Sequence, residues 1–281
     1  MSYSQHISTD NPALVIITID QSGSMAEAFT NVSMIVSKSE IASMIASAMI
    51  DEMKLRSTHI DGLYHYFDFV VLGYSRQDVY PLINNTLQPA PITTLENITP
   101  TRQQRTIEYI TPDNHLFLAV ESFSEWITPQ AAGATPMIEM LDTVTDIVDR
   151  WCKNRQNRDS FPPIILNITD GLSIAEYNSH PLQKCNHIKE IGTNDGKALL
   201  FNIYIDSMPA SERHNFTNID TLSPQDRLYP LAEMSSPLPE LFHPLAHKYN
   251  PTAAKEYRAF CHNAVSLQII PSLKFKSALL K

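Results

Sequence analysis

The sequence predicts an α/β fold, doubly wound, with a mostly parallel central sheet flanked by helices. Three mainly apolar runs, residues 14–19, 164–168 and 199–205, have the composition of strands that are buried on both faces of a parallel sheet. Residues 32–55 and 136–151 repeat apolar side chains at helical spacing, so we expect each to form a helix with one apolar face. This alternation of strand and helix is typical of a parallel sheet with connecting helices.

Weaker patterns predict the remaining elements. Residues 67–72 are expected to form a strand that ends at Gly73, and 78–83 a short strand paired with it through the turn at 73–77. A polar helix is expected over about 182–191, and a last helix over about 252–264.

We expect one domain over residues 1–281. Its parts are a core, an insertion and a C-terminal decoration, at about 12–206, 84–130 and 207–281. Prolines and many Thr, Asn and Gln residues interrupt the insertion, which predicts a long irregular surface excursion. Within it, residues 116–120 and 123–127 are open to a helical or an extended conformation.

The composition excludes several classes of function. The net charge of −9 disfavours binding to nucleic acid or to an anionic membrane surface, and no segment reaches the ~20 apolar residues of a membrane span. Residues 1–12 lack the features of a signal peptide, and Cys152, Cys185 and Cys261 are too few and too far apart for a disulfide framework. We therefore expect a cytoplasmic protein without membrane insertion, with secretion by a leaderless route as the open alternative.

Five oxygen-bearing side chains are predicted to meet at one edge of the sheet. Asp20, Ser22 and Ser24 follow the strand at 14–19, Asp170 follows the strand at 164–168, and Thr135 precedes a helix. The carboxyl ends of parallel strands are where such sheets bind ligands. Oxygen ligands of this kind select a hard divalent cation, Mg²⁺ before Mn²⁺ or Ca²⁺. Two carboxylates only balance the charge of the cation, which stays able to accept a carboxylate from outside.

Each segment also has a simpler interpretation. Residues 20–23 can form a turn after a strand, Thr135 can be an ordinary helix N-cap before a proline, and Asp170-Gly171 is a common strand exit. Three of the seven glycines fall in these segments, at positions 23, 133 and 171, which predicts unusual backbone geometry there.

The pattern Asp20-x-Ser22-x-Ser24, followed by Thr135 and Asp170, resembles the metal-ion-dependent adhesion site of von Willebrand factor A domains. The resemblance covers about residues 12–206, and the Gly-Ala-Thr-Pro form at 133–136 is similar to intracellular bacterial members of the tellurite-resistance type. It implies a Rossmann-like fold in which Ser22, Ser24 and Thr135 bind the metal directly and Asp20 and Asp170 bind directly or through water. A partner's Asp or Glu completes the coordination.

The resemblance further implies a bacterial protein-binding module and no enzyme. Bacterial relatives act beside kinases, phosphatases or AAA+ ATPases in stress, secretion or defence systems, so a partner of that kind is expected. One alternative is a metal-dependent hydrolase or phosphotransferase with Asp20 as nucleophile, although Ser22 stands where such sites carry a second carboxylate. The other is a scaffold in which the cation only stabilises the fold.

Zinc is a separate alternative. His243 and His247 are four residues apart, and Cys261 and His262 follow them, while Cys185 and His187 lie upstream. Pro244 lies between the two histidines and the tight Cys/His spacing of zinc sites is missing, so we favour the oxygen site.

Overall fold

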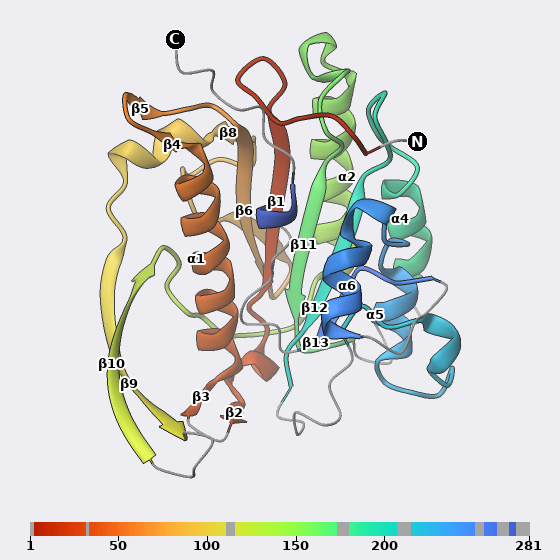
Figure 1. Cartoon of the computed structure of the whole chain (residues 1–281). Coiled ribbons are helices and arrows are strands. Elements are labelled where there is room, and N and C mark those ends of the chain that lie inside the picture. Colours follow the sequence, from red (N-terminus) through yellow and green to blue (C-terminus); the bar gives the residue numbers. More distant parts are fainter. Residues whose placement is uncertain are drawn as a thin grey trace.

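The computed structural model describes residues 3–31, 34–110, 116–172, 180–206, 215–250, 256–262 and 270–273. It confirms an α/β fold in which helices flank a central, mostly parallel sheet (Figure 1). None of the helices within these ranges is long and apolar enough to cross a membrane.

The central sheet has seven strands, five of which run parallel. The order across the sheet is β13-β12-β11-β1-β6-β7, and β8 pairs with β6. β7 and β8 are antiparallel to β6. The strands are β1 (Ala13–Asp20), β6 (Phe67–Ser75), β7 (Asp78–Pro81), β8 (Ala90–Pro91), β11 (Ile164–Thr169), β12 (Leu199–Tyr204) and β13 (Phe260–His262).

The strand order reverses beside β1. From β1 the chain continues to β6 on one side, whereas β11, β12 and β13 extend the sheet on the other side. In the register, Ile19 of β1 lies opposite Ile168 of β11, so the carboxyl ends of the two strands are neighbours. This reversal point is where open α/β sheets bind their ligands.

Helices cover both faces of the sheet (Figure 1). Because side chains alternate along a strand, Val15 and Ile17 of β1 pack in the core under α1, and Leu14 and Ile16 pack in the core under α2. The helices are α1 (Lys38–Ser57), α2 (Met137–Lys153), α4 (Pro181–Ile188), α5 (Tyr229–Met234) and α6 (His243–Tyr249). The short 3-10 helices are η1 (Gly23–Ala26), η2 (Ile92–Asn97), η3 (Arg155–Asn157), η5 (Ile219–Thr221), η6 (Glu240–Phe242) and η7 (Ile270–Ser272).

The predicted start of the first helix was wrong. A small antiparallel hairpin, β2 (Ala28–Asn31) and β3 (Met34–Ser37), precedes the helix. The helix begins where Ser37 and Glu40 form a capping box, in which the Ser37 side chain accepts from the Glu40 N–H at 3.2 Å and the Glu40 carboxylate accepts from the Ser37 N–H at 2.8 Å.

The insertion is also more regular than predicted. A long antiparallel hairpin, β9 (Thr101–Ile110) and β10 (Leu116–Glu125), lies alongside α1 (Figure 1), and it shows that residues 116–125 are extended. The Trp126 N–H donates to the Ser47 hydroxyl at 3.1 Å and its indole N–H donates to Asp51 at 2.8 Å, which anchors the hairpin to α1. A second, minimal hairpin is formed by β4 (Thr58–His59) and β5 (Gly62–Leu63).

The last predicted helix is contradicted over residues 256–262, of which 260–262 form β13 parallel to β12, while residues 252–255 and 263–264 of that prediction lie outside the described residues. Phe260 and Cys261 are apolar and fully buried, so their pairing with β12 overrides the helical spacing. The other predicted elements are confirmed to within a few residues at their ends. At one of these ends Gly73 lies inside β6, opposite Tyr80, so the hairpin turn is shorter than predicted.

Candidate metal centre

Four of the five predicted ligands meet at the reversal point of the sheet. Asp20 is the last residue of β1, Ser22 and Ser24 lie in the turn that follows it, and Asp170 directly follows β11. The Ser22 and Ser24 hydroxyl oxygens are 3.2 Å apart, and the Ser24 hydroxyl donates to Asp170 Oδ1 at 2.9 Å. These contacts join two segments that are 146 residues apart in the chain.

Asp20 is fully buried and is held at both oxygens. Its Oδ1 accepts from the Ser22 N–H at 2.9 Å, and its Oδ2 accepts from the Thr169 hydroxyl at 2.8 Å. Burial raises the pKa of Asp20 to about 6, because the hydrogen bonds from Ser22 and Thr169 offset only part of the desolvation and the nearby Asp170 adds repulsion. A buried carboxylate in this position is one that a bound cation would stabilise.

The segment that carries Thr135 packs against the same turn through backbone hydrogen bonds. The Gly23 N–H donates to the Gly133 carbonyl at 2.8 Å, and the Ala132 N–H donates to the Gln21 carbonyl at 2.7 Å. The N-cap alternative for Thr135 is contradicted, since α2 begins at Met137 with Pro136 as its N-cap and no capping side chain. Thr135 itself is half-buried beside the candidate site.

Two of the three glycines named from the sequence have unusual backbone geometry, whereas the φ of Gly23 lies outside the left-handed region. Gly133 has a φ of +79°, and a Cβ there would lie 2.5 Å from Cγ and 3.2 Å from Cα of Arg76. Gly171 has a φ of +130°. Both conformations favour glycine, and at Gly133 a side chain would also push apart the segments that position Thr135.

The oxygen spacing fits an octahedral ion. Neighbouring ligands at about 2.1 Å from Mg²⁺ and at right angles to each other are about 3 Å apart. The 3.2 Å between Ser22 and Ser24 and the 2.9 Å between Ser24 and Asp170 are hydrogen-bond distances that also leave the oxygens close enough to share such an ion. The residues present therefore suit a small, hard cation.

The prediction missed a cation that already touches the site. The Lys38 ammonium donates to Asp170 Oδ2 at 3.0 Å and to Glu27 Oε2 at 2.6 Å, and the Lys38 side chain is only 10% exposed. Burial lowers the pKa of Lys38, but the hydrogen bonds to the two carboxylates outweigh it, so the pKa lies above its usual value. Lys38 is the first residue of α1, and the incorrect helix start hid its position.

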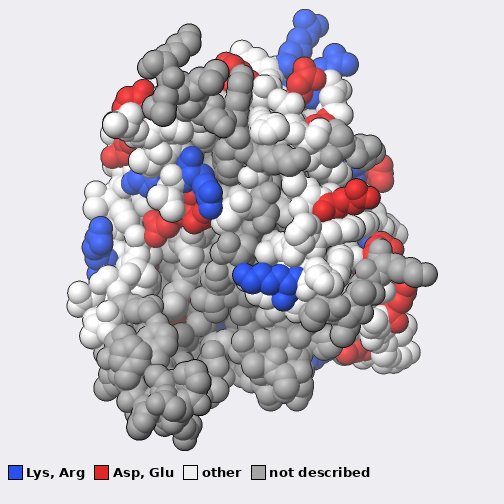
Figure 2. All heavy atoms as spheres, viewed as in Figure 1, with Lys and Arg blue, Asp and Glu red and all other residues white. Residues whose placement is uncertain are grey.

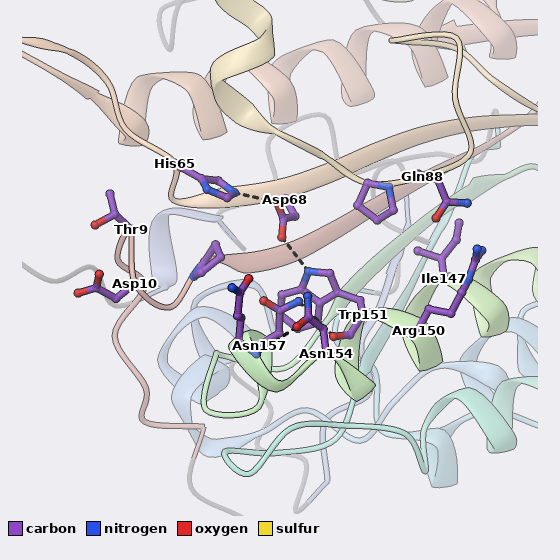
Figure 3. Close-up of a pocket in the computed structure, with 13 residues that line it drawn as sticks. Thr9, Asp10, His65, Asp68, Gln88, Ile147, Arg150, Trp151, Asn154 and Asn157 are labelled. Carbon is purple, nitrogen blue, oxygen red and sulfur yellow. Dashed lines mark hydrogen bonds and ion pairs between the residues drawn. The ribbon is translucent and has the colours of Figure 1, made fainter.

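Cavities lie at both ends of the sheet. One of about 200 Å³ adjoins the candidate site and is lined by Gln21, Arg76 and Tyr80 among others. The other, of about 710 Å³, lies at the amino ends of β1 and β6 (Figure 3), where Asp68 bonds His65 at 2.7 Å and the Trp151 indole at 2.8 Å. The larger cavity is therefore separate from the candidate metal centre.

The zinc alternative gains no support. Within the described parts of the chain, no three His, Cys, Asp or Glu side chains are grouped closely enough to hold a metal ion. His243 instead bonds the Leu238 carbonyl at 3.0 Å, and burial raises the pKa of the Cys185 thiol to about 12, which disfavours a thiolate ligand. This does not bear on the oxygen set, which has only two carboxylates and otherwise uses hydroxyl groups.

Comparison with known proteins adds little to this description. No family model matches the chain, and no curated protein matches it. A crystal structure described as an uncharacterized membrane-spanning protein from Vibrio fischeri matches 69% of this chain and 71% of that chain, at 13% identity and a TM-score of 0.30. A likeness this low carries no inference about this chain.

Proposed function

We propose that this chain is a von Willebrand factor A-type domain that binds Mg²⁺ and docks the carboxylate of a protein partner on it. One observation carries the proposal: the side-chain oxygens of Ser22, Ser24 and Asp170, from two distant segments, are joined by hydrogen bonds at the point where the strand order reverses. The buried Asp20 beneath them supports it further, because a cation would stabilise its charge.

Each ligand has a distinct task in this proposal. Ser22, Ser24 and Thr135 supply neutral hydroxyl oxygens, while Asp20 and Asp170 supply the negative charge, directly or through water. The metal supplies an electrophilic position for an incoming carboxylate. Mn²⁺ or Ca²⁺ would suit the same oxygens with a different affinity.

A protein partner fits the surroundings of the site better than nucleic acid does. The chain carries a net charge of −9, and on the face shown in Figure 2 the described basic side chains are scattered among acidic and uncharged ones. We propose a cytoplasmic bacterial module whose partner is a kinase, a phosphatase or an AAA+ ATPase. This choice of partner class rests on the family resemblance alone.

Capture of the partner from a native lysate, with identification by mass spectrometry, tests the proposal. The wild-type chain and Thr135→Ala are compared in Mg²⁺ and in EDTA. Thr143→Ala serves as matched control, because Thr143, half-buried like Thr135, lies on α2 and its side chain bonds the Glu139 carbonyl of its own helix. We expect a partner that carries an acidic docking residue to be retained by wild type and Thr143→Ala in Mg²⁺ only.

Two other results would contradict metal-mediated docking. A partner retained equally in EDTA and by Thr135→Ala would reduce the cation to a structural role. Mg²⁺-dependent turnover of a generic phosphoester, lost in Asp20→Asn, would instead favour the hydrolase alternative.

A further inference from the structure

Lys38 closes a ring of contacts around the candidate metal ligands. Its ammonium bridges Glu27 and Asp170, the other oxygen of Asp170 accepts from the Ser24 hydroxyl, and the Glu27 N–H donates back to the Ser24 carbonyl at 3.0 Å. The Lys38 N–H also donates to the Glu27 carbonyl at 3.0 Å. Two of the proposed ligands are thus tied to one lysine.

The placement of this lysine is unusual for an ordinary surface ion pair. Its side chain is 10% exposed and that of Asp170 is 8% exposed, whereas Glu27 is 66% exposed. Solvent therefore screens the pair with Glu27 much more than the pair with Asp170. The ammonium lies closer to Glu27, at 2.6 Å, but its pair with Asp170, at 3.0 Å, is the one that is shielded from solvent.

A divalent ion and Lys38 would compete for the same carboxylate. Asp170 Oδ2 already accepts from the ammonium, which offsets part of the negative charge of this carboxylate and shares its own charge with Glu27. If both cations contacted Asp170, they would repel each other in a region with little water. The ammonium holds Oδ2, whereas Oδ1 is the oxygen that faces Ser24, so coordination by Oδ1 would place the divalent ion and the ammonium on opposite oxygens of one carboxylate.

We infer that Lys38 is a built-in counter-ion of the metal centre, which competes with the divalent cation for Asp170 and so weakens metal binding. This inference rests on the proposed function and deepens it. The consequence is regulatory: the lysine raises the metal concentration at which the site fills. When the metal is bound, the same positive charge favours an external carboxylate as the next ligand.

Titration of the EDTA-treated, desalted full chain with Mn²⁺ tests this inference, with free Mn²⁺ measured by electron paramagnetic resonance. We expect Lys38→Met to bind Mn²⁺ at least about tenfold more tightly than wild type, and Lys38→Arg to stay within about threefold of wild type. Lys54→Met is the matched control, because Lys54 lies on the same helix but contacts Trp126, 5.2 Å from its ring centre. Its affinity should equal that of wild type.

A variant with the opposite expected sign covers the case in which Lys38→Met fails to fold. Glu27→Gln removes the exposed partner and leaves Lys38 to Asp170 alone, so Mn²⁺ binding should weaken by about threefold or more. Glu52→Gln on α1 is its charge-matched control. A purely structural role of Lys38 would lower the affinity in Lys38→Met and leave that of Glu27→Gln unchanged, because Glu27 is exposed and the Lys38–Asp170 pair would remain in place.

The possible outcomes separate the inference from the proposed function. If wild type binds Mn²⁺ and Asp20→Asn does not, but Lys38→Met binds equally or more weakly, the inference is overturned and the metal centre stands. If Lys38→Met does not fold, Glu27→Gln decides, and a Mn²⁺ affinity of Glu27→Gln that equals or exceeds that of wild type overturns the inference. If neither wild type nor Lys38→Met shows binding that depends on Asp20, the proposed function is overturned together with the inference.

Discussion

Replacing Asp20 by asparagine should stabilise the metal-free protein while it removes the metal site. The side chain is fully buried, and burial raises its pKa from 3.8 to about 6. Asparagine keeps the acceptor for the Ser22 N–H, and its amide can donate to the Thr169 hydroxyl, which can still donate to the Gly171 carbonyl at 3.1 Å. The variant therefore removes the buried charge and preserves the hydrogen bonds.

The size and pH dependence of the effect follow from the pKa of Asp20. Folding raises this pKa, so the carboxyl contributes stability that is fully present below pH 3.8 and is lost as the pH rises through about 6. One pKa unit corresponds to about 1.4 kcal/mol, so the free energy of unfolding of wild type should lie about 3 kcal/mol below that of Asp20→Asn near pH 7.5. Near pH 4.5 the gap should shrink to about 1 kcal/mol.

Urea unfolding in EDTA, followed by tryptophan fluorescence at both pH values, measures this gap. Asp142→Asn is the control, because Asp142 is exposed and pairs only with Lys184 among the described residues, so we expect a change below about 1 kcal/mol at either pH. Mg²⁺ at about one hundred times its Kd should then stabilise wild type by about 2.7 kcal/mol and leave Asp20→Asn unchanged. If Asp20→Asn is less stable than wild type near pH 7.5, or if the difference between their free energies of unfolding does not vary with pH, the ionised Asp20 carboxylate does not destabilise the metal-free protein.

Two further predictions concern the sheet and the Thr135 segment. Asn167 is buried, accepts hydroxyl hydrogen bonds from Thr18 and Tyr74 at 2.9 Å each and donates to Asn202. Asn167→Ala should therefore lower the free energy of unfolding, measured with urea, by about 2–4 kcal/mol, whereas alanine at an exposed asparagine on α4 should change it by almost nothing. A loss below about 1 kcal/mol in Asn167→Ala would contradict this prediction. Gly133→Ala should weaken Mg²⁺ binding at least about tenfold in calorimetry, because its Cβ would collide with the neighbouring segment. The control is alanine at position 62, where φ is +137° but no atom lies within 4 Å, and an equal loss of Mg²⁺ affinity there would contradict the local explanation.

The sequence predicted the elements whose stability comes from burial. β1, β11 and β12 are mainly apolar runs in which every residue is buried, so their composition marks them without reference to the rest of the chain. The start of α1 was misplaced because the apolar residues of β3 continue the helical spacing, while the capping box at Ser37 marks the true boundary. The β9–β10 hairpin was missed because its strands pair with each other outside the central sheet.

The candidate site was predictable where it depends on strand ends. Asp20 and Asp170 come directly at the ends of two recognisable strands, and parallel neighbours bring such ends together. Lys38 could not be placed from sequence, because its contact with Asp170 depends on where α1 begins. That start depends in turn on the β2–β3 hairpin before it, which was not predicted. β13 likewise depends on pairing with β12, which is distant in the sequence.

Diffraction from crystals soaked in Mn²⁺, recorded where manganese scatters anomalously, tests the central claim most directly. We expect an anomalous peak about 2.2 Å from the Ser22 and Ser24 hydroxyl oxygens, at the carboxyl ends of β1 and β11, which disappears in Asp20→Asn crystals treated identically. A peak elsewhere on the chain, or an ordered site at Ser22 and Ser24 with no peak at saturating Mn²⁺, would contradict a metal centre at these residues.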